Sequence, residues 1–473
     1  MDDELFDLVV IGSGPAGEKG AAQAAYHGKR VAVVERARLV GGTAVTTGGL
    51  PNKALRETAL YVSGARKKEV YGVSLELDSM ATFEQLRLRA AEISTLMSDA
   101  VMRNLKRHNI ELVRGQARLA PGGLVQVVSG DAERSLRAST VLVATGSRPL
   151  RPPDIPFDGH TVLDSDEILK LDRPVESVVI VGAGPVGCEY ASTFAAVGTK
   201  VWLVDLSQRL LPLLDTEISE LLASSLRRSG IEVIVGSGIA HVERDDAGVS
   251  VALDEGRVLR AERLLFGAGR VGNTEGLGLE AAGVEMDGRK RIVVDDHYRT
   301  TADGIYAAGD VIGPPALASV SMEQARVAMC HAFDIPLKQA VDRLLPFGIF
   351  TIPEVAGVGM SEEAARDAGV DYEVGRGWFA QNNRAAVAGE TEGLVKLVCA
   401  KDGRLLGVHI LGDDAAELIH LGQAVLRHGG SLEEFIHTTF NVPTRSDAYK
   451  YAAYDALTHI EVRAAFGDVA DAG

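Results

Sequence analysis

Two glycine-rich segments of the chain have the residue types and the spacing that dinucleotide phosphates require. Their glycines are Gly12, Gly14 and Gly17 in the first segment and Gly182, Gly184 and Gly187 in the second. Glycine permits a tight turn and lets a pyrophosphate approach the backbone, and the helix that follows presents unpaired N–H groups to the phosphates. The two segments therefore predict two nucleotide-binding sites in one chain.

Each glycine segment lies between two apolar runs, and the second run ends at an acid. The runs span 8–11 and 31–35 around the first segment and 178–181 and 201–205 around the second. This order predicts a strand, a glycine turn, a helix and a second strand, whose final acid, Glu35 or Asp205, can accept hydrogen bonds from a ribose. Two glycine turns of an ordinary α/β protein would not repeat all of these features at the same spacing.

The composition limits the class of protein. The chain has 473 residues, enough for about three domains, with 49 Lys and Arg against 65 Asp and Glu and a net charge of −16. Such a charge repels nucleic acid, so we expect no nucleic-acid partner. Residues 1–4 are acidic where a signal or transit peptide is basic, and no apolar stretch has the length of a membrane span. We expect a cytoplasmic protein.

The cysteines and histidines show no metal-binding or redox spacing. Cys188, Cys330 and Cys399 lie far apart with no CxxC motif, and the eleven histidines form no HExxH-type cluster. We therefore expect buried or half-buried thiols and no metal site.

A long amphipathic helix is expected from about Thr82 to His108. Its apolar face would comprise Leu86, Ile93, Leu96, Met97, Val101 and Leu105. An apolar strand is then predicted over 141–146, and it ends the part of the chain that contains the first glycine segment.

The pattern of apolar and glycine residues changes beyond the second glycine segment and its two strands. A strand ends in Gly309-Asp310, an ending that suits a cofactor contact. Two apolar runs, 394–399 and 405–411, flank Asp402-Gly403, which is typical of a hairpin, and a helix is expected over 415–428. The residues from about 346 onward therefore predict a separate α+β domain.

These motifs, in this order, resemble those of the pyridine nucleotide-disulphide oxidoreductase flavoproteins, the family of glutathione reductase and dihydrolipoamide dehydrogenase. Besides the glycine segments, the matching residues are Gly41-Gly42-Thr43, 50–55, Ala144-Thr145-Gly146, 269–273 and Ala308-Gly309-Asp310. The resemblance covers nearly the whole chain. It implies an α/β fold with two Rossmann-like dinucleotide-binding domains, each a three-layer ββα arrangement, and a C-terminal α+β dimerisation domain.

The same resemblance implies how the chain divides and what it binds. The implied domains are an FAD-binding domain at 1–155 and 274–345, an NAD(P)-binding domain at 156–273 and the dimerisation domain of a homodimer at 346–473. FAD would occupy the first glycine segment and contact Glu35, Thr43, Thr145, Gly146, Gly309 and Asp310. NAD(H) or NADP(H) would occupy the second and contact Asp205, Arg209 and Gly269.

Two further roles concern catalysis and nucleotide preference. By the resemblance, Lys53 lies beside the flavin and pairs with Glu189. Asp205 can bind the ribose hydroxyls of NAD(H) but repels a 2′-phosphate unless a cation compensates. Arg209 is either that cation or an ordinary loop arginine in an ion pair. We expect NADH to bind at least as well as NADPH.

Three positions depart from the disulphide-reducing members of the family. Those enzymes have two cysteines before the Pro-x-Lys element and a histidine before a late proline, whereas this chain has Ala44, Gly49 and Val442. A methyl group and a hydrogen cannot accept electrons as a thiolate does, and valine cannot carry a proton. Disulphide reduction is therefore excluded, and Asp447, the remaining acid of that late motif, is expected to be structural.

The segments 348–354 and 438–444 are similar to those of the soluble pyridine nucleotide transhydrogenases, a branch of the family. That branch implies hydride exchange between NAD(H) and NADP(H) through FAD. Two alternatives remain open: an NAD(P)H-dependent reductase of a quinone or another non-thiol acceptor, and a non-catalytic flavoprotein that senses nucleotides.

Overall fold

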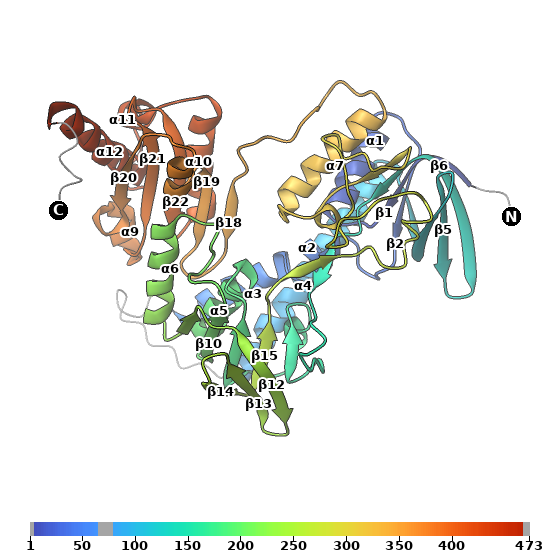
Figure 1. Ribbon diagram of the computed structural model, residues 1–473, viewed down its shortest axis with the longest axis horizontal. Helices are drawn as coiled ribbons and strands as arrows, with labels where there is room; N and C mark the ends of the chain where they lie inside the picture. Colours follow the sequence, from blue (N-terminus) through green and yellow to red (C-terminus); the bar gives the residue numbers. More distant parts are fainter. Residues whose placement is uncertain (1–3, 65–78, 467–473) are drawn as a thin grey trace. The chain divides into compact units, whose positions relative to one another are not determined.

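The structure, a computed structural model, describes residues 4–64 and 79–466 (Figure 1). Residues 1–3 of the acidic N-terminal segment and residues 467–473 of the predicted C-terminal domain lie outside the described residues. The chain forms two compact units, of which the first comprises 1–54, 86–150 and 269–342 and the second the remainder. No helix within the described ranges has both the length and the apolar character needed to cross a lipid bilayer.

The first unit is built on a seven-stranded sheet in the order β3-β2-β1-β6-β5-β4, with β17 beside β6. The strands are β1 (Glu4–Ile11), β2 (Val31–Glu35), β3 (Glu111–Arg114), β4 (Gln116–Ala120), β5 (Leu124–Ser129), β6 (Ala132–Val143) and β17 (Ile305–Ala307). The pairs among β1, β2, β3, β6 and β17 are parallel, whereas β4, β5 and β6 pair antiparallel. A short antiparallel pair, β7 (Ser147–Pro149) with β16 (Arg270–Gly272), also belongs to this unit.

Both faces of the parallel strands are covered, which explains why β1 and β2 are apolar without alternation. Leu8 and Val10 of β1 pack in the core beneath α1 (Pro15–Tyr26) and α7 (Ala318–Ala332). Val9, on the opposite face, packs with side chains of β4 and β5. The unit therefore has three layers, one of helices, one of parallel strands and one of antiparallel strands.

The long helix of the first unit exists, but one residue of its predicted apolar face is wrong. It is α4 (Ser79–Arg107), and it follows α2 (Gly42–Thr46) and α3 (Leu50–Ser63) along the chain. Val101 of α4 is buried, whereas Leu96 is 48% exposed. The buried face includes two serines, Ser94 and Ser98, and the Ser98 hydroxyl accepts a hydrogen bond from the backbone N–H of Val40 at 2.9 Å.

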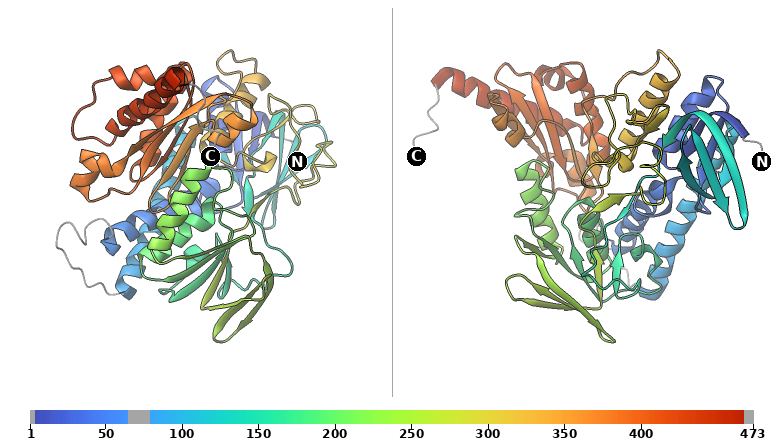
Figure 2. Two further views of the ribbon diagram at one scale, coloured as in Figure 1. Left: turned by 60° about the vertical axis from the view of Figure 1, so that its left-hand side comes forward. Right: turned by 45° about the vertical axis from the view of Figure 1, so that its right-hand side comes forward.

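The second unit begins with another parallel sheet, in the order β11-β10-β9-β15-β8. Its strands are β8 (Val162–Asp164), β9 (Ser177–Val181), β10 (Lys200–Asp205), β11 (Glu232–Val235) and β15 (Arg263–Phe266). One face packs against α5 (Pro185–Ala196) and α6 (Thr216–Arg228). The other packs against the antiparallel strands β12 (Ile239–Asp245), β13 (Gly248–Leu253) and β14 (Val258–Ala261), which form a layer of their own in both views of Figure 2.

The C-terminal domain, in the same unit, is a five-stranded antiparallel sheet in the order β18-β19-β22-β21-β20. Its strands are β18 (Phe347–Ile349), β19 (Val355–Gly359), β20 (Tyr372–Trp378), β21 (Leu394–Ala400) and β22 (Leu405–Leu411). Its helices are α8 (Glu362–Asp367), α9 (Asn383–Ala388), α10 (Ala415–Arg427), α11 (Leu432–His437) and α12 (Asp447–Phe466). The predicted hairpin is β21–β22 and the predicted helix is α10, so both predictions are confirmed.

The predicted fold class, two three-layer Rossmann-like units followed by an α+β domain, is confirmed. The glycine turn is the local feature of this fold that tolerates side chains least. A Cβ on Gly187 would lie 1.8 Å from the carbonyl oxygen of Gly182, so no side chain fits without a shift of the backbone.

The variant Gly187→Ala should lower the free energy of unfolding by about 2 kcal/mol or more, because the added methyl group overpacks a backbone contact. Thermal or urea unfolding measures this change. Gly288→Ala is the matched control, since a Cβ there would meet open space, and its stability should stay within about 0.5 kcal/mol of the wild type. Equal stability of the two variants would contradict the assigned packing.

Candidate nucleotide-binding sites

The first glycine turn joins β1 to α1 at the carboxyl end of the parallel strands. Gly12 adopts φ +102°, and its N–H donates to Val34 O at 2.9 Å, which fixes the turn beside β2. A Cβ on Gly17 would lie 1.9 Å from Gly12 O, so α1 begins directly against the end of β1. Gly14 is the N-cap of α1, and within the described residues no side chain caps this helix. The N–H groups of its first turn are therefore available to an anion.

Glu35 closes the first turn from the end of the neighbouring strand. It is buried, and its carboxylate accepts hydrogen bonds from Ser13 N at 3.0 Å, from Ser13 Oγ at 2.7 Å and from Ala37 N at 2.7 Å. The Ser13 hydroxyl also accepts a hydrogen bond from Gly41 N at 3.0 Å. Ser13 was not predicted from the sequence, and it links the turn to the predicted segment 41–43.

The segment 41–43 lies against the first turn. Gly42 adopts φ +60°, and a Cβ on it would lie 2.9 Å from the Cα of Gly14. Thr43 follows in the short helix α2. The structure thus brings together the predicted residues Gly14 and Thr43, although they are far apart in the sequence.

The remaining predicted contacts of the first site also gather in the first unit. Ser147 donates from Oγ to Asp310 Oδ2 at 2.7 Å and accepts from Arg270 Nε at 2.8 Å. Thr145 donates from Oγ1 to Asn273 O at 2.8 Å. Because β6 and β17 are parallel neighbours, their carboxyl ends place Thr145 and Asp310 at the same edge of the sheet.

Glycines complete that edge of the first unit. Gly309 adopts φ +82°, and its N–H donates to Gln324 Oε1 of α7 at 2.9 Å. Gly146 adopts φ +67° beside open space, and Gly269 adopts φ +132° and accepts a hydrogen bond from Leu150 N at 3.0 Å. The sequence analysis missed Gln324, which has no motif around it; Ser147 was signalled only by its place directly after Gly146.

The second glycine turn repeats the geometry of the first. Gly182 adopts φ +103°, and its N–H donates to Val204 O at 2.8 Å. Gly184 is the N-cap of α5, where the described residues again provide no capping side chain, and a Cβ on Gly184 would meet open space. The Asp205 carboxylate accepts from Ala183 N at 2.5 Å and from Ser207 N at 2.7 Å.

The geometry of each glycine turn fits a dinucleotide. Each presents an uncapped helix of 12 residues behind a glycine backbone, and each has a carboxylate at the end of the next strand. A carboxylate has about four lone-pair sites, so Glu35 and Asp205 keep acceptor capacity beyond the bonds described. The donors suit a pyrophosphate and the acceptors suit ribose hydroxyls.

The Arg209 side chain contacts its own loop and the first residue of α6. Its guanidinium donates to Thr216 Oγ1, to Pro212 O at 2.8 Å and to Leu214 O at 3.3 Å. Its role as a cation for a 2′-phosphate stays a prediction, and these contacts favour the loop role.

Lys53 and Glu189 lie in different units, and their pairing stays a prediction. Lys53 belongs to α3 and Glu189 to α5. Glu189 is buried, and its Oε1 accepts a hydrogen bond from Phe350 N at 2.9 Å. Arg56, which the sequence analysis missed, donates from Nε to Thr351 O at 3.1 Å and forms a 3.0 Å ion pair with Glu354. Two buried charged side chains thus hold the segment 350–354.

The positions of the missing thiols are adjacent in space. A Cβ on Gly49 would lie 2.3 Å from the carbonyl oxygen of Ala44. Val442, where disulphide reductases have a histidine, is 70% exposed. The cysteines that the chain does have are free and buried, as expected. Burial raises the pKa of the Cys188 thiol and that of Cys399, the latter to about 12.

We expect the native protein to react very slowly with a thiol reagent such as dithionitrobenzoate, because all three cysteines are buried and out of reach of the reagent. Counting the thiols released at 412 nm before and after denaturation measures this, and all three cysteines should react only when the chain is unfolded. A thiol that reacts within seconds in the native protein would contradict this assignment.

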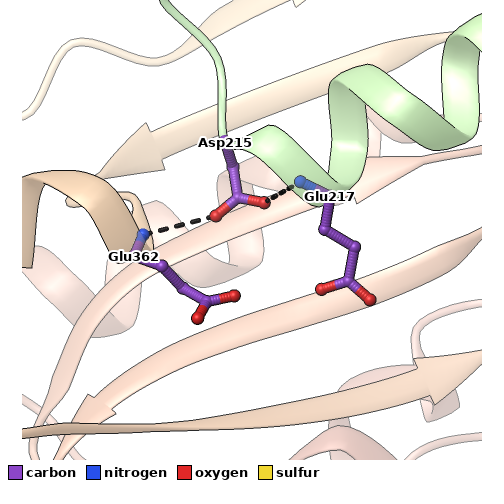
Figure 3. Close-up of side chains that lie close together, drawn as sticks. All are labelled: Asp215, Glu217 and Glu362. Atoms are coloured by element: carbon purple, nitrogen blue, oxygen red, sulfur yellow. Dashed lines mark hydrogen bonds between the residues drawn. The ribbon is translucent and has the colours of Figure 1, made fainter.

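Within the described residues, one group of carboxylates has the spacing of a cation site: Asp215, Glu217 and Glu362 (Figure 3). An ammonium already lies among them, because Lys396 Nζ donates to Asp215 Oδ1 at 2.7 Å, to Glu217 Oε2 at 2.9 Å and to Glu362 Oε1. The group is therefore a salt-bridge network rather than an open set of metal ligands.

Comparison with protein families gives two matches along the chain. Residues 6–332 match the model described as pyridine nucleotide-disulphide oxidoreductase, and residues 345–453 match its dimerisation domain.

Similar proteins of known name cover almost the whole chain. A protein of Mycobacterium bovis (strain BCG / Pasteur 1173P2) named soluble pyridine nucleotide transhydrogenase is 43% identical over 96% of this chain and 97% of its own length. One with the same name from Chromohalobacter salexigens is 40% identical over 96% and 99%. Among solved structures, the HOCl-induced flavoprotein disulphide reductase RclA of Escherichia coli, in a Cu(II) complex, superposes with a TM-score of 0.87 at 27% identity, over 96% of this chain and 99% of that one. LpdA of Mycobacterium tuberculosis superposes with a TM-score of 0.87 at 28% identity, over 95% and 99%.

Proposed function

Because this chain belongs to the pyridine nucleotide-disulphide oxidoreductase family, we propose that it is a transhydrogenase that exchanges hydride between NAD(H) and NADP(H). The family uses FAD and NAD(P)H, and the chain is a flavin-dependent oxidoreductase. The observation that carries the proposal is the pair of equivalent glycine turns in a chain without thiols at positions 44 and 49. The names of its relatives agree with this activity.

The first turn is the proposed FAD site. Gly12, Gly14 and Gly17 would let the pyrophosphate reach the N–H groups of α1, and Glu35 would accept hydrogen bonds from the adenosine ribose. The other proposed contacts, which lie at the carboxyl edge of the sheet or beside the turn, are Thr43, Thr145, Gly146, Gly309 and Asp310. Bound FAD supplies a two-electron carrier between a reduced and an oxidised nucleotide.

The second turn is the proposed site of the nicotinamide nucleotide. Gly182, Gly184 and Gly187 would bind its pyrophosphate over α5, and Asp205 would accept hydrogen bonds from the adenosine ribose. The other proposed residues are Gly269, Arg209, Lys53 and Glu189. Lys53 would hold a positive charge beside the flavin, where it favours reduction, and buried Glu189 would orient the Lys53 ammonium.

The absence of thiols at positions 44 and 49 limits which acceptors the enzyme can reduce. A disulphide substrate needs a thiolate in the protein, and Ala44 and Gly49 provide none. An oxidised nucleotide needs no more than the second site itself, because it can bind there after the first nucleotide leaves. The geometry around Gly49 is closed by Ala44, so it gives no support to a quinone pocket at that position.

The assembly and the location of the protein are also proposals. The C-terminal domain matches a dimerisation domain, which supports a homodimer. The net charge of −16 supports a protein without a nucleic-acid partner, and we propose a cytoplasmic location.

Reduction and reoxidation of the bound flavin test the proposed function. In stopped-flow mixing, NADH or NADPH should bleach the flavin absorbance near 450 nm, and an oxidised nucleotide, such as thio-NAD⁺, should restore it rapidly. Steady-state kinetics should then be ping-pong. Glutathione disulphide and lipoamide are the controls and should not be turned over at enzymatic rates. Rapid reoxidation by a quinone alone would overturn the transhydrogenase proposal, and the absence of any reduction would favour a nucleotide sensor.

Nucleotide preference tests the role of Asp205. Asp205→Asn removes the negative charge while keeping one acceptor oxygen, and it should raise the KM for NADH by about tenfold. The KM for NADPH should rise less or fall, because the repulsion of the 2′-phosphate is removed. Initial rates with each nucleotide measure both changes, and an equal effect on the two would contradict the assigned ribose contact.

A further inference from the structure

The segment 206–215 connects the proposed ribose acid to the first turn of α6. Near its start, Ser207 N donates to Asp205 Oδ1 at 2.7 Å, and further along, Leu211 N donates to Ala183 O of the second glycine turn at 3.0 Å. Leu206 is 70% exposed and Leu213 97% exposed, so much of the segment borders solvent. Its conformation therefore bears directly on the backbone around Asp205.

The end of this segment is fixed by Asp215, the N-cap of α6. Its fully buried carboxylate accepts hydrogen bonds from Glu217 N at 3.1 Å and Ile218 N at 3.4 Å, which satisfies two N–H groups of the helix. Its other oxygen accepts from Glu362 N at 3.3 Å, in the first turn of α8 of the C-terminal domain. Figure 3 shows the Asp215 carboxylate between the backbone of α6 and that of α8.

Lys396 of β21 places a positive charge among the carboxylates at the start of α6 and α8. Its side chain is fully buried, and its ammonium donates to Asp215, Glu217 and Glu362 together. Burial would lower the pKa of Lys396, but the hydrogen bonds to these carboxylates outweigh it and raise the pKa, so the ammonium stays charged. Arg376 of β20 adds a two-point contact with Glu217 at 2.7 and 3.0 Å. Figures 1 and 2 show α6 beside the strands of this domain.

Glu363 of α8 reaches the segment itself. Its carboxylate accepts a hydrogen bond from Thr216 N at 3.2 Å and lies 3.9 Å from Arg209 Nη1. Burial would raise the pKa of Glu363, but hydrogen bonds from Thr216 hold it down at about 2, so the carboxylate is ionised at neutral pH. Arg209 in turn donates to Pro212 O and Thr216 Oγ1. The C-terminal domain thus holds the arginine that the sequence suggested for a 2′-phosphate.

We propose that the C-terminal domain positions the segment 206–215 through Lys396 and Glu363, and so sets the affinity of the second glycine turn for the adenosine half of the nicotinamide nucleotide. The inference rests on the proposed function, which places that nucleotide at Asp205. The physical basis is preorganisation, since a segment already ordered by α8 and β21 loses less conformational entropy when a ligand binds beside it. Lys396 and Glu363 are positioning residues, because they act through the segment.

Glu363→Ala is the test variant. The Glu363 side chain is about a third exposed, whereas Lys396→Met would leave buried Asp215 and two half-buried carboxylates without their ammonium and endanger the fold. Titration calorimetry with ADP-ribose should show a Kd about fivefold higher for Glu363→Ala than for the wild type. The KM for NADH should rise by a similar factor, while kcat at saturating nucleotide stays unchanged.

Two further variants separate positioning from a general loss of contact. Glu363→Gln keeps an oxygen that can accept from Thr216 N and should restore most of the affinity for ADP-ribose. Glu392→Gln is the matched control, because Glu392 of the C-terminal domain pairs with Arg228 at the opposite end of α6. It removes an exposed ion pair between the C-terminal domain and the other end of the same helix, and should leave the Kd unchanged. An equal change in Glu363→Ala and Glu392→Gln, or no change in Glu363→Ala, would overturn the inference.

The failure of the inference can be told from the failure of the proposed function. If wild-type protein does not bind ADP-ribose, or if Asp205→Asn binds it as tightly as the wild type, the placement of the nucleotide fails and the inference fails with it. If Asp205→Asn weakens binding and Glu363→Ala does not, the nucleotide site stands and only the coupling to the C-terminal domain is wrong.

Discussion

The contact between the third and the first glycine of each turn is the constraint on which both nucleotide sites depend. The carbonyl oxygen of Gly12 occupies the place of a Cβ on Gly17, and that of Gly182 occupies the place of a Cβ on Gly187. This contact brings the start of each helix against the end of its strand, so the helix N–H groups face the carboxyl edge of the sheet. The acid of the neighbouring strand then reaches the turn, as Glu35 reaches Ser13 N. The covered sheets behind the turns hold these few backbone atoms in place.

The two turns differ in what lies around them, and this difference gives a physical basis for unequal roles. The first is enclosed by its own unit, because Gly41 and Gly42 pack against Ser13 and Gly14. The second is bordered by the segment 206–215, whose end is held by the side chains of Lys396 and Glu363 and by the backbone N–H of Glu362, all in the C-terminal domain. An enclosed turn suits a resident cofactor, and a turn bordered by a segment with solvent-exposed residues such as Leu206 and Leu213 suits a nucleotide that exchanges. The difference supports a first site for FAD and a second for NAD(P)H.

Local patterns in the sequence were enough to predict the fold class and the glycine turns. Positive φ angles at Gly12 and Gly182, and the hairpin around Asp402-Gly403, follow from residue types within a few positions. The partners of side chains could not be predicted in this way. Ser98 lies on the buried face of α4, where its hydroxyl accepts a hydrogen bond from the distant backbone N–H of Val40, whereas Leu96 is exposed. Lys396 has no motif around it, and its three carboxylates come from α6 and α8, so only the packing of the domain brings them together.

The backbone around positions 44 and 49 makes the loss of disulphide chemistry more than a change of two side chains. Gly49 N donates to Thr43 O at 3.3 Å, and a Cβ at position 49 would lie 2.6 Å from the Cα of Ala44 as well as 2.3 Å from its carbonyl oxygen. Contacts this short with backbone atoms cannot be relieved by a rotation of a side chain. Two cysteines introduced at these positions would therefore need a different backbone between Thr43 and Leu50 before their sulfurs could meet in a disulphide. In the present backbone the segment is closely packed, with no space for a disulphide relay between positions 44 and 49.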